Sequence, residues 1–90
     1  MDEKTAAFRL EFKKNLIDWL QLEDKQPEDI KDEEALFGEG LGLDSLDAVE
    51  IVIMLQRKYS IPQSEVDRNR AIFATLASLS DFVQSKLAER

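Results

Sequence analysis

The chain of 90 residues contains no cysteine and no histidine. It therefore has no disulfide, and it lacks the two side chains that most often bind zinc. A serine or thiol nucleophile also needs an adjacent base or a lowered pKa before it reacts, and histidine usually supplies that base. The composition argues against an enzyme, so we expect no catalytic residue and no metal site.

Long apolar runs are also missing from the sequence. No run approaches the length of a membrane span, and the start, MDEKTAAFRL, lacks the apolar core of a signal peptide. We therefore expect a cytoplasmic protein with no membrane span. Ninety residues provide for one hydrophobic core and leave no room for a second. The expectation is a single domain over residues 1–90, present as a monomer.

Charge is plentiful but uneven along the chain. There are 19 acidic and 12 basic residues, and eleven of the acidic residues but only two of the basic ones lie in residues 21–50. Such a field repels nucleic acid and attracts basic protein surfaces, whose rate of encounter it raises. The charge pattern therefore predicts protein partners and no nucleic acid.

The spacing of apolar residues is helical in four segments. It predicts helices over about residues 4–22, 45–59 and 76–88, and a short helix over residues 66–72. Between the first two, residues 23–43 hold a proline, three glycines and an acidic run, which predict an irregular loop. No segment alternates as a strand does. The predicted fold is an all-α, small four-helix bundle of three main helices and one short helix.

The long loop and the second helix carry the residues whose placement matters most. In the loop, Ile30, Leu36 and Phe37 are predicted to pin the chain to the core, and a loop of roughly twenty residues is long enough to suggest a function. The predicted core stripe of the second helix consists of Ala48, Val49, Val52, Leu55 and Tyr59. The opposite face is predicted to carry Leu46, Glu50, Ile53 and Arg57. That face is either a docking surface with apolar anchors or an ordinary solvated surface.

The stretch from Gly38 to Glu50, GEGLGLDSLDAVE, places Ser45 where a glycine-rich loop meets the start of a helix. A helix start offers unpaired backbone N–H groups and the positive end of the helix dipole, so a side-chain oxygen there can carry a phosphate. Ser45 is therefore a candidate attachment site. The alternative is that Ser45 or Asp44 only caps the helix.

The string Asp44-Ser45-Leu46, with Gly40 and Gly42 before it and Asp47, Val49 and Glu50 after it, resembles the prosthetic-group site of acyl carrier proteins. The order of helix, loop, motif and helices is similar to a free-standing bacterial acyl carrier protein over roughly residues 8–83. The resemblance implies that a transferase using coenzyme A and magnesium attaches 4′-phosphopantetheine to Ser45. It also implies that acyl intermediates are held as thioesters on that arm.

By the same resemblance, the partners are the phosphopantetheinyl transferase, ketosynthase and other acyl-processing enzymes of fatty-acid or polyketide synthesis. The residues implied to contact them are Asp44, Leu46, Asp47, Glu50 and Ile53. The core between the second, third and fourth helices is implied to shelter the acyl chain.

The sequence departs from the common fatty-acid carriers at the end of the second helix, where Gln56, Arg57 and Lys58 replace acidic residues. Arg68-Asn69-Arg70 adds further positive charge. The departure favours a dedicated carrier in a specialised pathway, such as polyketide or aryl polyene synthesis. Two alternatives stay open. One is an aminoacyl or peptidyl carrier, and the other is an unmodified acidic helical adaptor that binds partners through Leu46 and Ile53.

Overall fold

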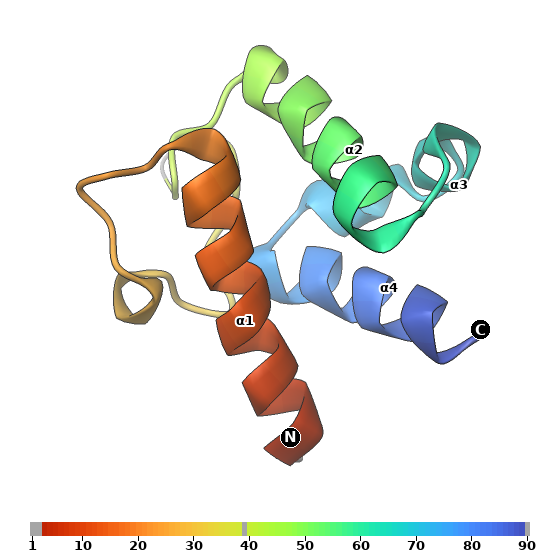
Figure 1. The fold of residues 1–90 in the computed structure, drawn as a ribbon. Helices are drawn as coiled ribbons and strands as arrows, with labels where there is room; N and C mark the ends of the chain where they lie inside the picture. The colour runs from red at the N-terminus through yellow and green to blue at the C-terminus, as the bar shows by residue number, and fades with distance from the viewer. Residues whose placement is uncertain (1–2, 39, 90) are drawn as a thin grey trace.

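The structure is a computed structural model that describes residues 3–38 and 40–89. Over these residues the chain forms the helices α1 (Glu3–Leu20), α2 (Ser45–Tyr59), α3 (Gln63–Asp67) and α4 (Leu76–Ala88), with 3₁₀ turns η1 (Pro27–Asp29) and η2 (Arg70–Phe73) (Figure 1). No β-strand occurs in this part of the chain beyond two isolated bridges. The predicted all-α class is confirmed.

Two helices have bounds that differ from the predicted ranges. The segment predicted as one helix over 66–72 is two, because α3 ends at Asp67 and η2 begins at Arg70. Between them, Asn69 has a non-helical backbone, and its side-chain Nδ2 donates to the Glu65 carbonyl at 2.8 Å, a local bond that competes with the helix. The first helix ends at Leu20 instead of residue 22, because Gln21 adopts a left-handed conformation with φ 56°.

The other two predicted ranges, 45–59 and 76–88, agree with α2 and α4. The N-terminus of α4 is capped by Thr75, whose Oγ1 accepts from the Ser78 N–H at 3.0 Å. The C-terminus of α2 closes at Ser60, which is left-handed with φ 56°. The following N–H, of Ile61, then donates to the Leu55 carbonyl at 3.0 Å, and both of these side chains are buried.

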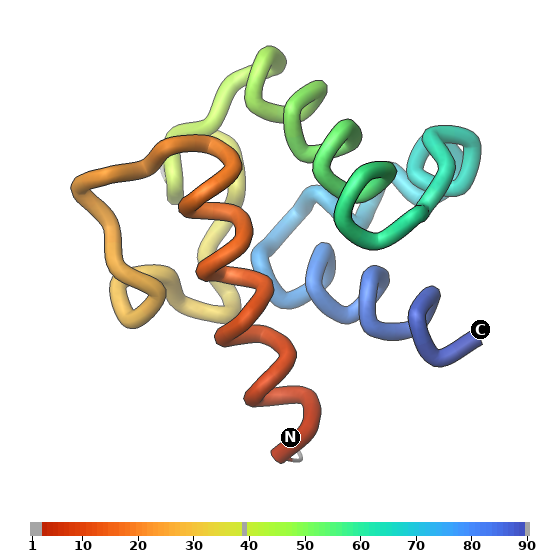
Figure 2. Tube along the Cα trace, viewed as in Figure 1, coloured from red at the N-terminus to blue at the C-terminus, as the bar shows by residue number. Residues whose placement is uncertain are grey.

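The helices enclose one hydrophobic core. Helix α1 packs against α2 and α4, α2 also contacts α4, and the short α3 lies beside α2 (Figure 2). The buried apolar side chains are Phe12, Leu16, Ile30, Leu36, Leu43, Ile51, Met54, Leu55, Tyr59, Ile61, Val66, Ile72, Leu76, Leu79 and Val83. None of the described helices is long and apolar enough to cross a bilayer.

The core face of α2 differs from the predicted stripe. Val49, predicted to be in the core, is 57% exposed, whereas Ile51 and Met54 are fully buried. The prediction for Val49 was therefore wrong. The physical reason is that α2 contacts α1 on one side and α3 on the other, so its apolar residues spread over more than one arc and the spacing alone cannot say which arc is innermost.

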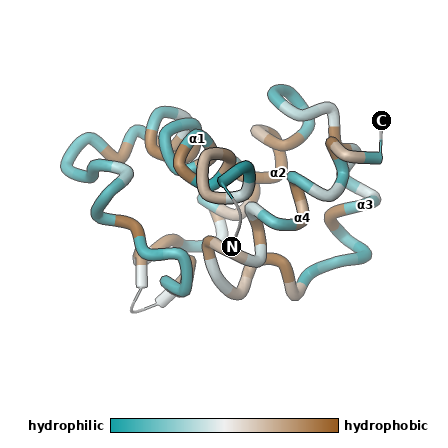
Figure 3. Tube along the Cα trace, turned by 90° about the horizontal axis from the view of Figure 1, so that it is seen from below, coloured by the Kyte–Doolittle hydropathy of each residue, from teal (hydrophilic) through white to brown (hydrophobic). Residues whose placement is uncertain are grey.

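The loop over residues 21–38 and 40–44 runs outside α1 and returns to α2, and much of its outer course is hydrophilic (Figure 3). It is nevertheless anchored at several points. Ile30 and Leu36 are buried, as predicted, and Phe37 is partly buried. The backbone carbonyl of Asp32 accepts from the Ala77 N–H at 2.7 Å, which ties the loop to the first turn of α4.

An ion cluster around Asp32 adds a second tie. Asp32 accepts from Arg9 Nη1 and from Lys13 Nζ, each at 2.9 Å, and Arg9 also reaches Asp81 of α4 at 2.9 Å. The Arg9, Lys13 and Asp32 side chains are between 13% and 22% exposed. The hydrogen bond from Lys13, followed by that from Arg9, holds the pKa of Asp32 below its ordinary value of 3.8, although burial opposes this. The cluster joins the loop to α1, and Arg9 extends it to α4.

We expect Asp32→Asn to destabilise the fold by about 1 to 2 kcal/mol, between the values for exposed and buried ion pairs. Because the pKa of Asp32 is lowered in the folded state, its charge stabilises the fold fully above pH 3.8 and loses this effect as the pH falls through the lowered pKa. Melting curves of both proteins should therefore converge in acid. Glu33→Gln is the control, because Glu33 is an exposed neighbour that forms no ion pair with any other described residue. Equal destabilisation by Glu33→Gln would contradict the assignment.

Candidate functional site

Helix α2 begins with a complete capping box in which Asp44 is the cap. Asp44 Oδ1 accepts from the N–H groups of Leu46 at 3.0 Å and Asp47 at 3.1 Å, and Asp47 Oδ2 accepts from the Asp44 N–H at 3.1 Å. Ser45 is the first helical residue, and it is exposed. Of the two caps that the sequence left open, Asp44 is the one that the structure shows, and Ser45 does not cap the helix.

The cap leaves Ser45 free for other chemistry. Among the described residues, neither its hydroxyl nor its backbone N–H has a hydrogen-bond partner. The N–H groups of Asp44, Leu46 and Asp47 are all satisfied by the capping box. The backbone N–H of Ser45 is therefore the one that remains unpaired in the first turn. It could donate to an oxygen of a group attached to the Ser45 side chain.

The loop that delivers Ser45 depends on a tight turn at Gly40. The N–H of Leu41 donates to the Ala35 carbonyl at 2.9 Å, and a Cβ at Gly40 would collide with that same carbonyl. Gly42, three residues before Ser45, has φ +72°, which favours glycine. Both glycines of the motif are thus explained by backbone geometry.

The outward face of α2 carries two strongly exposed apolar side chains, Leu46 at 75% and Val49 at 57%. Leu46 was predicted there, and Val49 was missed because its spacing also fits a core position. The acidic residues beside them keep free acceptors. In the described chain, Asp44 Oδ2 and Asp47 Oδ1 make no hydrogen bond, since each carboxylate uses its other oxygen in the cap.

Two further predicted contact residues are placed differently from each other. Glu50 is exposed, and its Oε2 accepts from the indole N–H of Trp19 on α1 at 3.1 Å. Ile53, in the next turn of α2, is partly buried. Leu46, Val49 and Ile53 thus form one stripe along α2 at spacings of three and four. The contact between Trp19 and Glu50 is a further feature of the site, and no pattern in the sequence predicts it.

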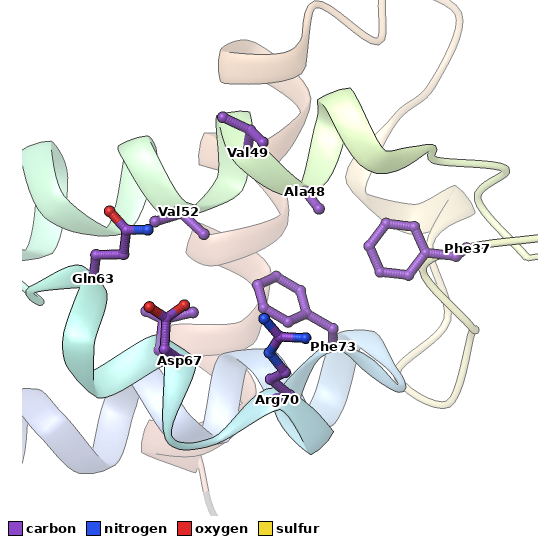
Figure 4. Close-up of a pocket in the computed structure, with 9 residues that line it drawn as sticks. Phe37, Ala48, Val49, Val52, Gln63, Asp67, Arg70 and Phe73 are labelled. Atoms are coloured by element: carbon purple, nitrogen blue, oxygen red, sulfur yellow. The ribbon is translucent and has the colours of Figure 1, made fainter.

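A hollow of about 400 Å³ opens beside this stripe, between α2 and the segment of α3 and η2 (Figure 4). Its lining residues are Phe37, Ala48, Val49, Val52, Gln63, Val66, Asp67, Arg70 and Phe73. The rings of Phe37 and Phe73 lie 6.2 Å apart between centroids. This hollow is lined by residues of α2, α3 and η2 and by Phe37 of the loop, and by none of α4.

The acidic residues do not gather into a metal site. Within residues 3–38 and 40–89, no three Asp, Glu, His or Cys side chains come together in a way that could hold an ion. The chemistry available at the site is therefore that of one exposed hydroxyl at a helix start, with an apolar hollow and an acidic rim beside it.

The comparisons with known proteins agree with this geometry. The family described as the phosphopantetheine attachment site matches residues 16–84, which include all of α2 and α3. The chain is 38% identical over 61 residues to an acyl carrier protein of Wolinella succinogenes, a stretch covering 66% of this chain and 74% of the relative. No solved structure matches significantly. The chain belongs to the acyl carrier protein family and is a carrier, not an enzyme, with phosphopantetheine as its cofactor.

Proposed function

We propose that Ser45 is the residue that carries the phosphopantetheine arm. The observation that supports it most is that Asp44 caps α2 and so leaves the Ser45 hydroxyl exposed and without a hydrogen bond among the described residues. The Ser45 hydroxyl would attack the phosphorus of coenzyme A that bears the pantetheine, and its proton would pass to a base of the transferase or to water. A new O–P bond forms, the pyrophosphate bond breaks, and adenosine 3′,5′-bisphosphate leaves.

The residues present fit such a group. The unpaired N–H of Ser45 and the positive end of the α2 dipole favour a phosphate at this point. Once bound, the arm supplies a terminal thiol that holds acyl chains as thioesters. The chain's own part is to fix the attachment point and to expose it. The rigid helix start and the Gly40 turn do this by setting the direction from which Ser45 is approached.

Presentation to partner enzymes is the second part of the proposed function. The docking stripe consists of Leu46, Val49 and Ile53, and Asp44, Asp47 and Glu50 surround it. Exposed apolar anchors can be desolvated by a partner, while the free carboxylate oxygens steer a basic surface toward Ser45. The partners that we propose are the phosphopantetheinyl transferase, ketosynthase and other acyl-processing enzymes.

The hollow supports acyl cargo over aminoacyl or peptidyl cargo. Most of its lining is apolar, with Phe37, Val52 and Phe73 among its walls. An apolar surface of this kind gains free energy by covering a hydrocarbon chain. Synthesis of fatty acids or of polyketides is therefore the proposed setting. Cytoplasmic localisation and the monomeric state remain predictions from the sequence.

The first test of this function is modification of Ser45. Incubation with coenzyme A, magnesium and a broad-specificity transferase should add the mass of one phosphopantetheine, and Ser45→Ala should abolish the gain. Because Asp44 is the cap, Ser45→Ala should change the melting temperature little, whereas Asp44→Ala should cost about 1 kcal/mol. Ser64→Ala, at the start of α3, is the matched control and should load normally. Modification that survives Ser45→Ala would refute the assignment.

A second test concerns the docking stripe. Leu46→Ala and Val49→Ala should each speed dissociation from the transferase about fivefold to tenfold, which corresponds to about 1 to 1.4 kcal/mol. Their melting temperatures should change little, because both side chains are mostly exposed. Leu10→Ala removes an exposed leucine of α1 and should leave the kinetics unchanged. Surface plasmon resonance measures the rates, and an equal effect of Leu10→Ala would place docking elsewhere.

A third test separates the two roles of Glu50. Glu50→Gln keeps an oxygen that can accept from Trp19 but removes the charge, so association should slow and depend less on salt while Trp19 fluorescence stays the same. Glu50→Ala removes both, and it should also shift the fluorescence. The two variants are compared by stopped-flow association at low and at physiological salt. Unchanged association of Glu50→Gln at low salt would show that this charge does not steer partners.

A further inference from the structure

The charges of α2 are divided between its two ends. Its acidic residues, Asp47 and Glu50, lie in the first half, and its basic residues, Arg57 and Lys58, lie in the last turn. Residues 51–56 between them carry no charge. Glu50 and Arg57 are about two helical turns, or about 10 Å, apart along the axis. They form no salt bridge in the described part of the chain, so the helix keeps an acidic end and a basic end.

The basic end of α2 is open to solvent. Arg57 and Lys58 are both exposed, and the salt bridges among the described residues use other cations. Their place in the last turn suits the negative end of the helix dipole. That role is one of charge alone and needs no hydrogen bond from either side chain. The donors of both side chains therefore stay available to a second molecule.

Arg57 lies on the same face of α2 as the docking stripe of Leu46, Val49 and Ile53. It follows Ile53 by four residues and Leu46 by about three helical turns, so the helical repeat returns it to that face. Glu50 is exposed one turn after Leu46. The face thus carries acidic and apolar side chains in its first half and a cation at its far end.

We infer that Arg57 and Lys58 bind an acidic group of the partner enzyme, and that the carrier selects partners whose docking surface has opposite charges at its two ends. A basic patch of such a partner meets Asp47 and Glu50, and an acidic patch about 10 Å further along meets Arg57. A surface that is basic throughout is repelled at the far end. The inference rests on the proposed function, because it concerns the face that presents Ser45, and it adds the kind of surface that fits.

Two stapled helical peptides without tryptophan serve as probes. Both carry leucines along one face and a pair of lysines at one end, and their other end holds two glutamates in the first probe and two glutamines in the second. The protein has a net charge of -7, so long-range attraction alone favours the second, more positive probe. Contact with the basic end of α2 favours the first.

Calorimetry at low salt gives the two Kd values. The emission of Trp19, the one tryptophan of the chain, reports whether a probe reaches the acidic end, because its indole N–H donates to Glu50. We expect the glutamate-ended probe to bind about threefold to tenfold more tightly, as two exposed ion pairs allow. Both probes should shift the Trp19 emission.

The double variant Arg57→Gln, Lys58→Gln should lose this preference, because only the long-range attraction then distinguishes the probes. The double variant Lys14→Gln, Lys31→Gln is the matched control. It changes the net charge by the same amount at exposed cations outside α2, and it should keep the preference. A role of Arg57 and Lys58 at the helix dipole alone would lower the melting temperature of the first variant and give no preference in the unchanged protein.

Several results would overturn the inference. They are no measurable binding of either probe, equal affinities, tighter binding of the glutamine-ended probe, or a preference that survives the loss of Arg57 and Lys58. Sedimentation that shows the free protein pairing, and the variant without these cations monomeric, would also overturn it, because a second copy would then occupy the face. Intact mass after incubation with the transferase tests the proposed function separately. If Ser45 loads and the probes bind equally, the inference alone fails.

Discussion

The placement of Asp32 between α1 and α4 is the contact on which the rest of the site depends. A connection of this length has a large conformational freedom that its anchors must offset. Asp32 anchors it twice, through its carboxylate to Arg9 and Lys13 and through its carbonyl to Ala77. The same connection then supplies Leu36 to the core and later Asp44 to the start of α2. The loop that ends at the exposed serine is therefore held at its middle by an ion cluster and at its end by the capping box of α2.

The apolar side chains of helix α2 face three different environments. Ile51 and Leu55 face the core, Val52 faces the hollow, and Leu46 faces solvent. A helix with apolar residues on all three arcs has no single hydrophobic stripe, so its extent can be read from the sequence more securely than its orientation. The misplacement of Val49 is a direct result. The same residue lies at the boundary between the hollow and the outer face of α2, because it lines the hollow and is still 57% exposed.

Local patterns account for what the sequence predicts well. The ranges of α2 and α4 and the burial of Leu36 all depend on residues close together in the chain or on apolar character alone. Contacts between distant segments could not be predicted. Trp19 and Glu50 are 31 positions apart, and nothing in either segment shows that an indole N–H meets that carboxylate. Arg70 likewise appeared only as part of a basic cluster, because its place in the hollow requires α3 and η2 to be oriented first.

The charged residues fall into two groups that salt affects differently. The bridges of Arg9 and Lys13 to Asp32 join partly buried groups, and ions screen such pairs weakly. The carboxylates of Asp47 and Glu50 lie on the outer face, where their long-range attraction for a basic partner is screened within about 8 Å at physiological ionic strength. Salt therefore weakens the approach of partners at concentrations that leave the loop anchored. The ion pairs that anchor the loop and the carboxylates proposed to attract partners are therefore separate groups with different responses to salt.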